Sequence, residues 1–383
     1  MSAPRILLVT RNLPPLLGGM ERLNLRLAAA LAERAEVHVV GPGGAEAYLP
    51  PEVLLHPVPL KPLPRFLASA FARTLMLARR LRPEWIVAGS ALTAPMALAA
   101  ARISGAQAAA YAHGLDLAVP HPLYRALWYP AIRRLDRLIA NSRYTAGLAQ
   151  ALGVPHDRLA LVHPGVDLPP PDPQARARFR ARHGLDEQPV LLSVGRLTAR
   201  KGLREFVTEV LPRIVAKQPD AALVVVGDVP KDALHAQAQT PQAILDAARR
   251  CGIEHALRFT GPLFGPALDE AWYAADLHVF PVRELPNDPE GFGMVAIEAA
   301  AHGLPTVAYA TGGVVDAVAD GVSGRLVAPG DAAAFADAIL QLLATPLDEA
   351  GIRAFAKGFA WEVFGERVRQ VLQTTPLPVG GDR

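Results

Sequence analysis

Two glutamates in the second half of the chain, Glu290 and Glu298, are separated by seven residues. Glu290 precedes the glycine-rich stretch 291–293, and Glu298 lies in the alanine-rich, helix-forming run that follows. The pattern predicts one carboxylate just before a helix start and the other in the early turns. Backbone N–H groups at a helix start can hold an anion, so carboxylates are expected there only if they face other partners, such as sugar hydroxyls.

Two cations follow a predicted strand over residues 190–194. Arg196 comes directly after Gly195, and Lys201 lies five residues later, just before Gly202. On a short loop this spacing lets a planar guanidinium and a mobile ammonium converge on one pyrophosphate. The alternative is solvated surface charge, which is the usual fate of such residues.

Glycines and a histidine stand where other predicted strands end. Gly18 and Gly19 close a Pro-rich loop before a predicted helix over 20–31, and Gly227 follows a predicted strand over 221–226. N–H groups at that helix start are available to a diphosphate, although a simple strand-to-helix turn is the alternative. His113 ends a predicted strand over 108–113, at the edge where open α/β sheets bind ligands.

Together these motifs resemble the donor-binding signature of the retaining glycosyltransferases of family 4. The resemblance implies that Glu290 contacts hydroxyls of the transferred sugar and that Glu298 binds the ribose hydroxyls of the nucleotide. It implies that Arg196 and Lys201 bind the donor phosphates, and that His113 hydrogen-bonds the donor sugar near the reacting carbon. Further residues expected along the nucleotide sugar are Gly18, Gly19, Gly195, Gly227, Phe292, Gly293 and Met294.

Three further residues either differ from the family pattern or are weaker candidates for the site. Asp116 is a weaker candidate, for contact with the acceptor. Asp316 stands where the family usually has Glu and receives no role. Arg200 is one position off the family pattern, and we expect it to be exposed.

Strands alternate with helices along the whole chain, which predicts doubly wound parallel sheets of the α/β class. The resemblance implies the GT-B architecture, two Rossmann-like domains facing across a cleft. We expect an acceptor-side domain over 1–170, a nucleotide-sugar donor domain over 171–360, and a C-terminal helix, about 361–383, that crosses back to the first domain. Residues 306–308 are expected to form the last strand, and Pro212 to kink a helix over 205–215.

Composition narrows the class of protein. With 383 residues, 51% hydrophobic and 20% charged, the chain is expected to form more than one globular core. The single cysteine, Cys251, excludes an intrachain disulfide and a cysteine-based metal site, and we expect it to be buried. We find no run long enough to cross a membrane and no signal peptide, so a cytoplasmic location is expected.

Charge is unevenly distributed. Residues 1–170 carry a net charge of +8 and residues 171–383 carry −5. Two basic segments with apolar or aromatic residues, 65–82 and 124–137, could lie on an anionic membrane at its inner face, or could simply be solvated. The membrane interpretation predicts a lipid-linked glycan or glycolipid acceptor, and no nucleic-acid partner is expected.

The implied reaction moves a sugar from a UDP- or GDP-linked donor to an acceptor hydroxyl with retention at the anomeric carbon. The chain contains no Asp-x-Asp motif, so neither a metal nor another cofactor is expected, and the cations and helix N-termini would stabilise the leaving group. A sugar-nucleotide 2-epimerase and a non-catalytic nucleotide-sugar binding subunit remain as alternatives. A dehydrogenase would need a dinucleotide fingerprint, but Glu46 stands where its third glycine belongs.

Overall fold

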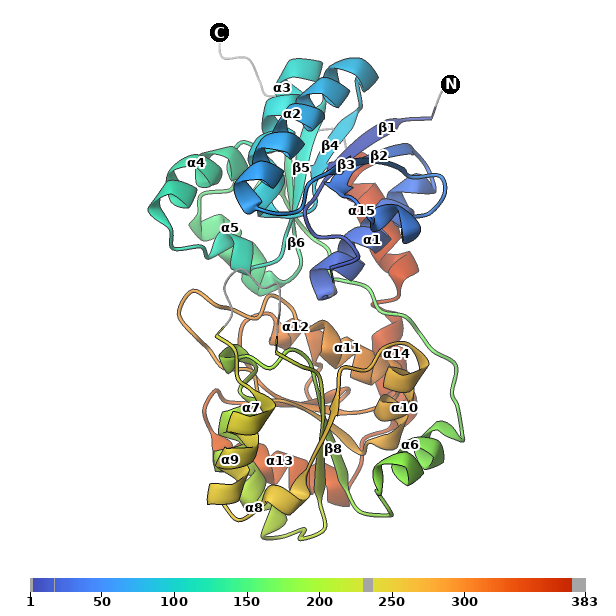
Figure 1. The fold of residues 1–383 in the computed structure, drawn as a ribbon, viewed down its shortest axis with the longest axis vertical. Helices are drawn as coiled ribbons and strands as arrows, with labels where there is room; N and C mark the ends of the chain where they lie inside the picture. The colour runs from blue at the N-terminus through green and yellow to red at the C-terminus, as the bar shows by residue number, and fades with distance from the viewer. Residues whose placement is uncertain (1–2, 17, 230–236, 374–383) are drawn as a thin grey trace. The chain divides into compact units, whose positions relative to one another are not determined.

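The computed structural model describes residues 3–16, 18–229 and 237–373. The chain divides into two compact units (Figure 1). Unit 1 comprises Met1–Gly165 and the segment Trp361–Arg383, whereas unit 2 comprises Val166–Ala360. Each unit has its own sheet and its own hydrophobic core.

Unit 1 is built on a seven-stranded sheet with the order β3-β2-β1-β4-β5-β6-β7, and its neighbouring strands pair in parallel. Most of these strands are short apolar runs, as expected for a sheet covered on both faces. The strands are β1 (Arg5–Val9), β2 (Glu36–Pro42), β3 (Leu54–Val58), β4 (Trp85–Ala88), β5 (Gln107–Ala112), β6 (Arg137–Ala140) and β7 (Leu159–Leu161).

Helices cover both faces of this sheet. On one face α2, α3 and α4 pack into a common core with β1, β4 and β5. On the other face the Phe364 ring of α15 lies 6.1 Å from the Tyr111 ring of β5, and Arg369 donates to the Ala30 carbonyl of α1 at 3.0 Å (Figure 1). The helices are α1 (Gly19–Ala32), α2 (Leu63–Leu81), α3 (Ala94–Ser104), α4 (Pro122–Ile132), α5 (Arg143–Ala151) and α15 (Trp361–Gln373).

Unit 2 contains a six-stranded sheet with the order β10-β9-β8-β11-β12-β13, again with parallel pairing. The strand order reverses beside β8, as in doubly wound folds. The strands are β8 (Val190–Val194), β9 (Ala222–Val226), β10 (Leu257–Gly261), β11 (Leu277–Phe280), β12 (Thr306–Tyr309) and β13 (Gly324–Val327).

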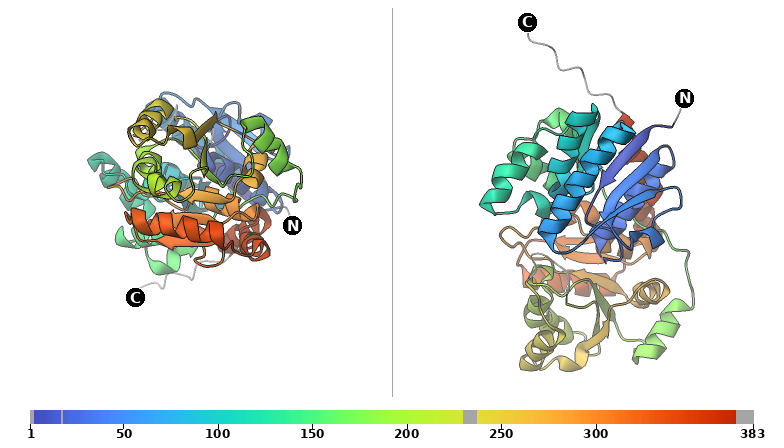
Figure 2. Two further views of the ribbon diagram at one scale, coloured as in Figure 1. Left: turned by 90° about the horizontal axis from the view of Figure 1, so that it is seen from below. Right: turned by 45° about the horizontal axis from the view of Figure 1, so that its top comes forward.

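The unit 2 sheet is also covered on both faces, which confirms the predicted α/β class (Figure 2). One face packs against α7 (Leu203–Glu205), α8 (Leu211–Val215), α9 (Pro241–Arg250) and α13 (Ala332–Ala344). The other packs against α6 (Ala175–His183), α10 (Pro266–Ala274), α11 (Met294–Ala301), α12 (Val314–Ala317) and α14 (Glu349–Lys357).

Pro212 disturbs its helix, as predicted. The helical stretch after Gly202 is interrupted by a π-helical segment, Phe206–Val210, and α-helical geometry resumes at Leu211. Proline has no N–H, and its ring collides with the carbonyl four residues earlier. The wider π-helical turns accommodate this defect within a continuous helix.

Other local predictions were wrong. Strands β3, β10, β11 and β13 were not predicted, and the last strand is therefore β13 and not β12. β3 has the sequence Leu-Leu-His-Pro-Val, without the uniform apolar run of the central strands, because one of its sides has no neighbouring strand. Cys251 is exposed, because it follows the last residue of α9 and stands at the end of that helix.

Candidate functional site

The carboxyl edge of the unit 2 sheet collects most of the residues predicted for the donor. Gly195 follows β8, Gly227 follows β9, and the loop that contains Glu290 connects β11 to α11. Strands of a parallel sheet end on the same side, which is where open α/β sheets bind ligands. The structure therefore brings together residues that lie far apart in the sequence.

Gly195 and Gly227 contact each other directly. Gly227 has φ of +145°, and a Cβ added to it would lie 1.9 Å from the Gly195 carbonyl oxygen. The Leu197 N–H donates to the Asp228 carbonyl at 3.0 Å, which joins the loops that follow β8 and β9. Only glycine allows this close approach at position 227, so its demonstrated role is packing, and contact with the donor stays a prediction.

Lys201 is held by an aromatic ring and a carboxylate. Its Nζ lies 4.7 Å from the centre of the Phe280 ring and 2.7 Å from Glu290 Oε2. Phe280 ends β11, so the cation from the loop after β8 rests on the neighbouring strand. Cation–π attraction and the ion pair both restrict the lysine side chain.

Arg200 belongs to the same cluster, and the prediction that it is exposed was wrong. Its side chain is 11% exposed, its Nη1 donates to Glu290 Oε2, and its Nε lies 3.1 Å from Asp288. Sequence spacing missed this residue because its partners belong to a loop about 90 residues away. Arg196, by contrast, is exposed.

These charges set the protonation of Glu290. Burial would raise its pKa, but attraction to Arg200 and Lys201, with a smaller contribution from Arg196, lowers the pKa to about 2. Burial lowers the pKa of Lys201, and Glu290 opposes that change. Burial, and then Lys201, lower the pKa of His278 on β11 to about 3. Near neutral pH Glu290 is therefore ionised and His278 is neutral.

Helix α11 begins where the sequence predicted it. Gly293 precedes the helix with φ of +96°, and a Cβ there would lie 2.8 Å from the Phe280 ring. The Phe292 side chain is only 3% exposed and belongs to the core, so only its backbone could meet a ligand. Met294 and Glu298 are half-buried in the first two turns. Their nucleotide-binding roles stay predictions.

The glycine loop between β12 and α12 contacts the loop that contains Glu290, and this contact was not predicted. The Gly313 N–H, between β12 and α12, donates to the Glu290 carbonyl at 2.8 Å. A Cβ on the neighbouring Gly312 would lie 2.5 Å from the same carbonyl oxygen. The consecutive glycines at 312 and 313 were a visible signal, but the segment that they approach could not be read from the sequence.

In unit 1, Gly18 and Gly19 stand at the start of α1, as predicted. The first helical turn, however, carries the Glu21 carboxylate, which accepts from Asn12 Nδ2 at 2.8 Å. A Cβ on Gly18 would lie 2.5 Å from Glu21 Oε2, so this carboxylate covers the glycine. Binding of a diphosphate here stays a prediction, and it would require Glu21 to move.

His113 lies buried at the carboxyl edge of the unit 1 sheet. Its Nε2 is 2.9 Å from the Gly89 carbonyl, which can only accept, so Nε2 is the donor in this hydrogen bond. Asp116 accepts the His113 N–H at 2.9 Å and the Ala91 N–H at 2.8 Å. Asp116 thereby shapes this loop, and its contact with an acceptor stays a prediction.

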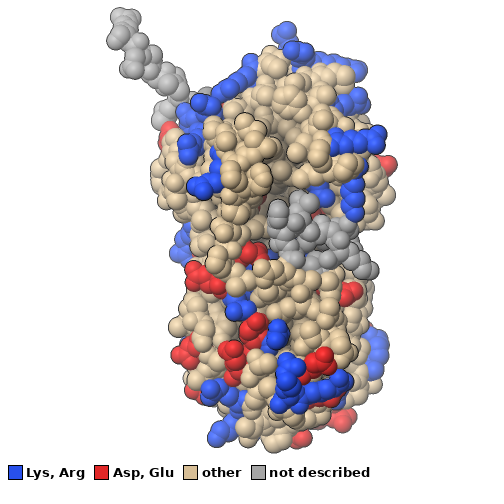
Figure 3. Space-filling model, turned by 60° about the vertical axis from the view of Figure 1, so that its left-hand side comes forward, with Lys and Arg blue, Asp and Glu red and all other residues tan. Residues whose placement is uncertain are grey.

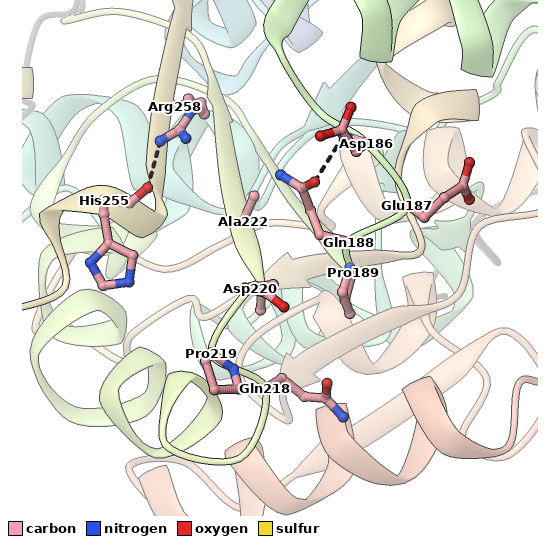
Figure 4. Close-up of a pocket in the computed structure, with 11 residues that line it drawn as sticks. Asp186, Glu187, Gln188, Pro189, Gln218, Pro219, Asp220, Ala222, His255 and Arg258 are labelled. Atoms are coloured by element: carbon pink, nitrogen blue, oxygen red, sulfur yellow. Dashed lines mark hydrogen bonds between the residues drawn. The ribbon is translucent and has the colours of Figure 1, made fainter.

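Unit 2 also has a pocket away from the predicted site. A pocket of about 660 Å³ lies at the opposite edge of the sheet, where β8, β9 and β10 begin, and none of the predicted site residues lines it (Figure 4). Within the described residues, no three His, Cys, Asp or Glu side chains come together as metal ligands would.

Two doubly wound units, with cations and glutamates gathered at a sheet edge, define the class of GT-B glycosyltransferases. The solved structure of Anabaena HepE in complex with UDP has a TM-score of 0.79 at 20% identity, covering 97% of this chain and 100% of that one. WaaG, a glycosyltransferase involved in lipopolysaccharide biosynthesis, has a TM-score of 0.71 at 19% identity, with 97% and 100% covered. The predicted fold is confirmed.

Sequence comparison identifies the family. Residues 17–169 match the Glycosyltransferase Family 4 domain, and residues 188–345 match the Glycosyl transferases group 1 domain. The GDP-mannose-dependent alpha-(1-6)-phosphatidylinositol monomannoside mannosyltransferase of Mycolicibacterium smegmatis is 32% identical over 393 residues, covering 96% of this chain and 98% of the relative. The D-inositol 3-phosphate glycosyltransferase of Geodermatophilus obscurus is 38% identical over 237 residues, covering 60% and 51%.

The chain therefore belongs to family 4 of the glycosyltransferases, as predicted, and transfers sugar from a nucleotide sugar.

The low pKa of Glu290 predicts how its ion pairs respond to acid. Their stabilising contribution is complete above the ordinary pKa of 4.5 and is lost as the pH falls toward about 2. Glu290→Gln should therefore lower the free energy of unfolding, and its difference from the native protein should be larger at pH 6 than at pH 3. Urea denaturation followed by circular dichroism measures this difference.

The control for this experiment is Glu349→Gln, which breaks a surface pair whose carboxylate is 67% exposed. Its difference from the native protein should be small at both pH values. A Glu290→Gln difference that does not change between pH 6 and pH 3 would contradict the assignment.

Proposed function

We propose that this protein is a retaining hexosyltransferase that uses a GDP- or UDP-linked sugar and needs neither a metal nor another cofactor. The observation that carries the proposal is the cluster of Lys201, Arg200 and Glu290 at the ligand edge of unit 2. GDP-mannose is the first donor to test, because the M. smegmatis relative, similar over nearly its full length, is named for it.

The proposed chemistry depends mainly on electrostatic positioning. The departing nucleoside diphosphate carries the charge that develops in the transition state, and Arg196 and Lys201 would stabilise it. The glutamate beside Lys201 would accept hydrogen bonds from hydroxyls of the transferred sugar and so orient its anomeric carbon. Arg200 would hold that glutamate in place.

The environment of Glu290 favours a same-face route over a covalent intermediate. Its Oε2 accepts from both Lys201 and Arg200, and its pKa is about 2. A carboxylate stabilised in this way is a weak nucleophile. In the same-face route the leaving phosphate helps to deprotonate the acceptor hydroxyl, which requires no protein nucleophile.

For the acceptor we propose a lipid-linked glycan or glycolipid used in assembly of a cell-surface polysaccharide, with the protein at the inner face of the membrane. We call the outer surface of α2, α3 and α4 the three-helix face. These helices contain six arginines and no acidic residue. Their exposed large apolar side chains are Phe71, Met76, Ile103, Leu123 and Leu127.

Apolar side chains among arginines suit an anionic lipid surface. Figure 3 shows one side of unit 1 in its upper half, where blue Lys and Arg side chains border a largely tan surface. Within the described residues, no helix is both long and apolar enough to cross a membrane. The contact proposed here is therefore peripheral.

The aromatic residues of α4 do not provide this contact. Trp128 Nε1 donates to the Leu92 carbonyl at 2.7 Å, the Tyr124 ring stacks on Trp128 at 5.0 Å, and Tyr129 is buried. On this helix the exposed apolar side chains are Leu123 and Leu127, one turn apart, which are 58% and 56% exposed.

The first functional prediction concerns Arg196 and Lys201 in the loop after β8, which we call the phosphate loop. Given a panel of radiolabelled nucleotide sugars, the native protein should slowly hydrolyse one donor without any acceptor. Arg196→Ala and Lys201→Ala should each reduce that rate roughly 10- to 150-fold, because each removes one charge-assisted phosphate contact of about 1.5 to 3 kcal/mol. Arg204→Ala, an exposed arginine on the adjacent helix, should retain the native rate.

Conversion of a donor to its 2-epimer would instead support the epimerase alternative. Nucleotide binding without hydrolysis or transfer would support the non-catalytic alternative. Native rates in both phosphate-loop variants would contradict the roles proposed for Arg196 and Lys201.

The second prediction separates the two glutamates. If Glu298 binds the ribose, Glu298→Ala should weaken binding of the free nucleoside diphosphate roughly 10-fold or more, whereas Glu290→Gln should mainly lower kcat. Calorimetry with GDP and UDP measures the first effect and steady-state kinetics the second. Glu254→Ala, at an exposed site in unit 2, is the control. Equal nucleotide affinity in the native protein and Glu298→Ala would refute the assignment.

The third prediction tests the membrane contact. The protein should cosediment with vesicles that contain phosphatidylglycerol, and binding should fall as salt rises, because each well-placed cation contributes about 1 kcal/mol. Charge reversal of the exposed pair Arg133 and Arg134 to Glu should weaken binding, as should Leu123→Ser with Leu127→Ser. Reversal of Arg249 and Arg250, another exposed pair on unit 2, should not.

Absence of binding at low salt would favour a water-soluble acceptor instead.

A further inference from the structure

Buried polar atoms without hydrogen-bond partners gather at the carboxyl edge of the unit 1 sheet. Among the described residues they include Arg11 Nε, Ser90 Oγ, Asn24 Oδ1 and Asn141 Oδ1. Leaving such atoms unpaired costs free energy, so most buried polar groups in folded proteins are paired. These four follow, or pack beside, the strand ends where an open α/β sheet binds ligands.

Arg11 is the most unusual of these residues. It is only 6% exposed, and no hydrogen bond or ion pair of its side chain is found in the described parts of the chain. The other deeply buried arginine, Arg180 at 5% exposure, is fully engaged: it donates to Asp276 at 2.9 Å and to the Ala274 carbonyl at 3.0 Å. A buried guanidinium without a counter-charge calls for an anion.

A buried hydroxyl, that of Ser90, lies at the same edge of the sheet as Arg11. β1 and β4 pair with Val9 opposite Ala88, and the Gly89 N–H continues the ladder to the Val9 carbonyl at 2.9 Å. Arg11 and Ser90 each lie two residues beyond these paired strand ends, at the same edge of the sheet. The Ser90 side chain is 1% exposed and its Oγ has no partner within the described structure.

Other polar side chains extend this edge of the sheet. His113 and Asn141 end the next two strands, and Asn141 Nδ2 donates to the His113 carbonyl at 3.3 Å. The nearby carboxylates are already bound: Asp116 accepts two backbone N–H groups, and Glu21 accepts from Asn12. Neither forms an ion pair with Arg11 within the described residues.

We propose that Arg11, assisted by Ser90, binds a phosphate group of the acceptor. A phosphate offers several strong acceptor oxygens, so it can take the guanidinium N–H groups and a serine hydroxyl together. This proposal rests on the glycosyl transfer proposed above and specifies the chemistry of its acceptor: a phosphorylated polyol, as the headgroup of a lipid or, should the membrane contact fail its test, as a free molecule. Both relatives cited above are named for inositol compounds that carry phosphate, which agrees with this chemistry.

Binding measurements can test the proposal without catalysis. Calorimetry would compare D-inositol 3-phosphate with inositol, and cosedimentation would compare phosphatidylinositol vesicles with phosphatidylserine vesicles of equal anionic content, so that the charge offered to the three-helix face is the same. The native protein should prefer the inositol phosphate of one pair, either free or as a lipid headgroup, roughly 10-fold or more. Preference in the first pair identifies a free polyol as the source, and preference in the second alone identifies a lipid headgroup.

Variants of Arg11 and Ser90 test whether these residues cause the preference for inositol phosphate. Arg11→Gln should abolish it, Arg11→Lys should retain part of it because the charge remains, and Ser90→Ala should weaken it. Arg34→Gln, an exposed arginine that follows α1 and lies outside the three-helix face, is the matched control and should keep the native preference. Thermal unfolding followed by circular dichroism checks that each variant is folded.

Two outcomes would overturn the proposal. One is that the native protein shows no preference in either pair, which remains decisive even if Arg11→Gln does not fold. The other is that Arg11→Gln weakens GDP and UDP binding as much as it weakens phosphate-bearing acceptors, which would assign Arg11 to the donor. Failure of the native protein to bind any nucleoside diphosphate would count against the proposed function alone.

Discussion

The ligand edge of unit 2 depends on one buried set of ion pairs, in which Glu290 accepts from both Lys201 and Arg200. Burying three charges is costly, and here mutual attraction offsets the cost because each charge has a partner. The pairs also join the loop after β8 to the loop after β11. Removing one partner would leave another charge buried and uncompensated. It would also remove a contact between the two loops.

Both units bury some polar atoms without partners among the described residues, but only the edge of unit 2 has its buried cations paired with carboxylates. In unit 2 the central cations and carboxylates satisfy one another, so that edge is assembled before any substrate arrives. In unit 1 several buried polar atoms lack partners within the described residues. Such atoms are the ones that a substrate can satisfy.

Much of the fold could be predicted because central strands of covered parallel sheets are short apolar runs followed by glycine or polar residues. β1, β8 and β9 are of this kind. The edge strands β3 and β13 were missed because their outer sides have no neighbouring strand and their sequences are correspondingly mixed. The exposure of Cys251 was missed because the apolar character of a residue does not show that it lies just beyond the end of a helix, where it can be exposed.

The sequence by itself determined the family, the α/β class, and the positions of the two glutamates and of the loop after β8 with Arg196 and Lys201. These features depend on local spacing and glycine placement. Only the tertiary structure decided which charges meet. Arg200 and Glu290 are 90 residues apart, and Arg11 and Ser90 come to the same sheet edge only through the pairing of β1 with β4. Pairing and burial are properties of the folded chain, because they arise where strands distant in sequence end at one edge.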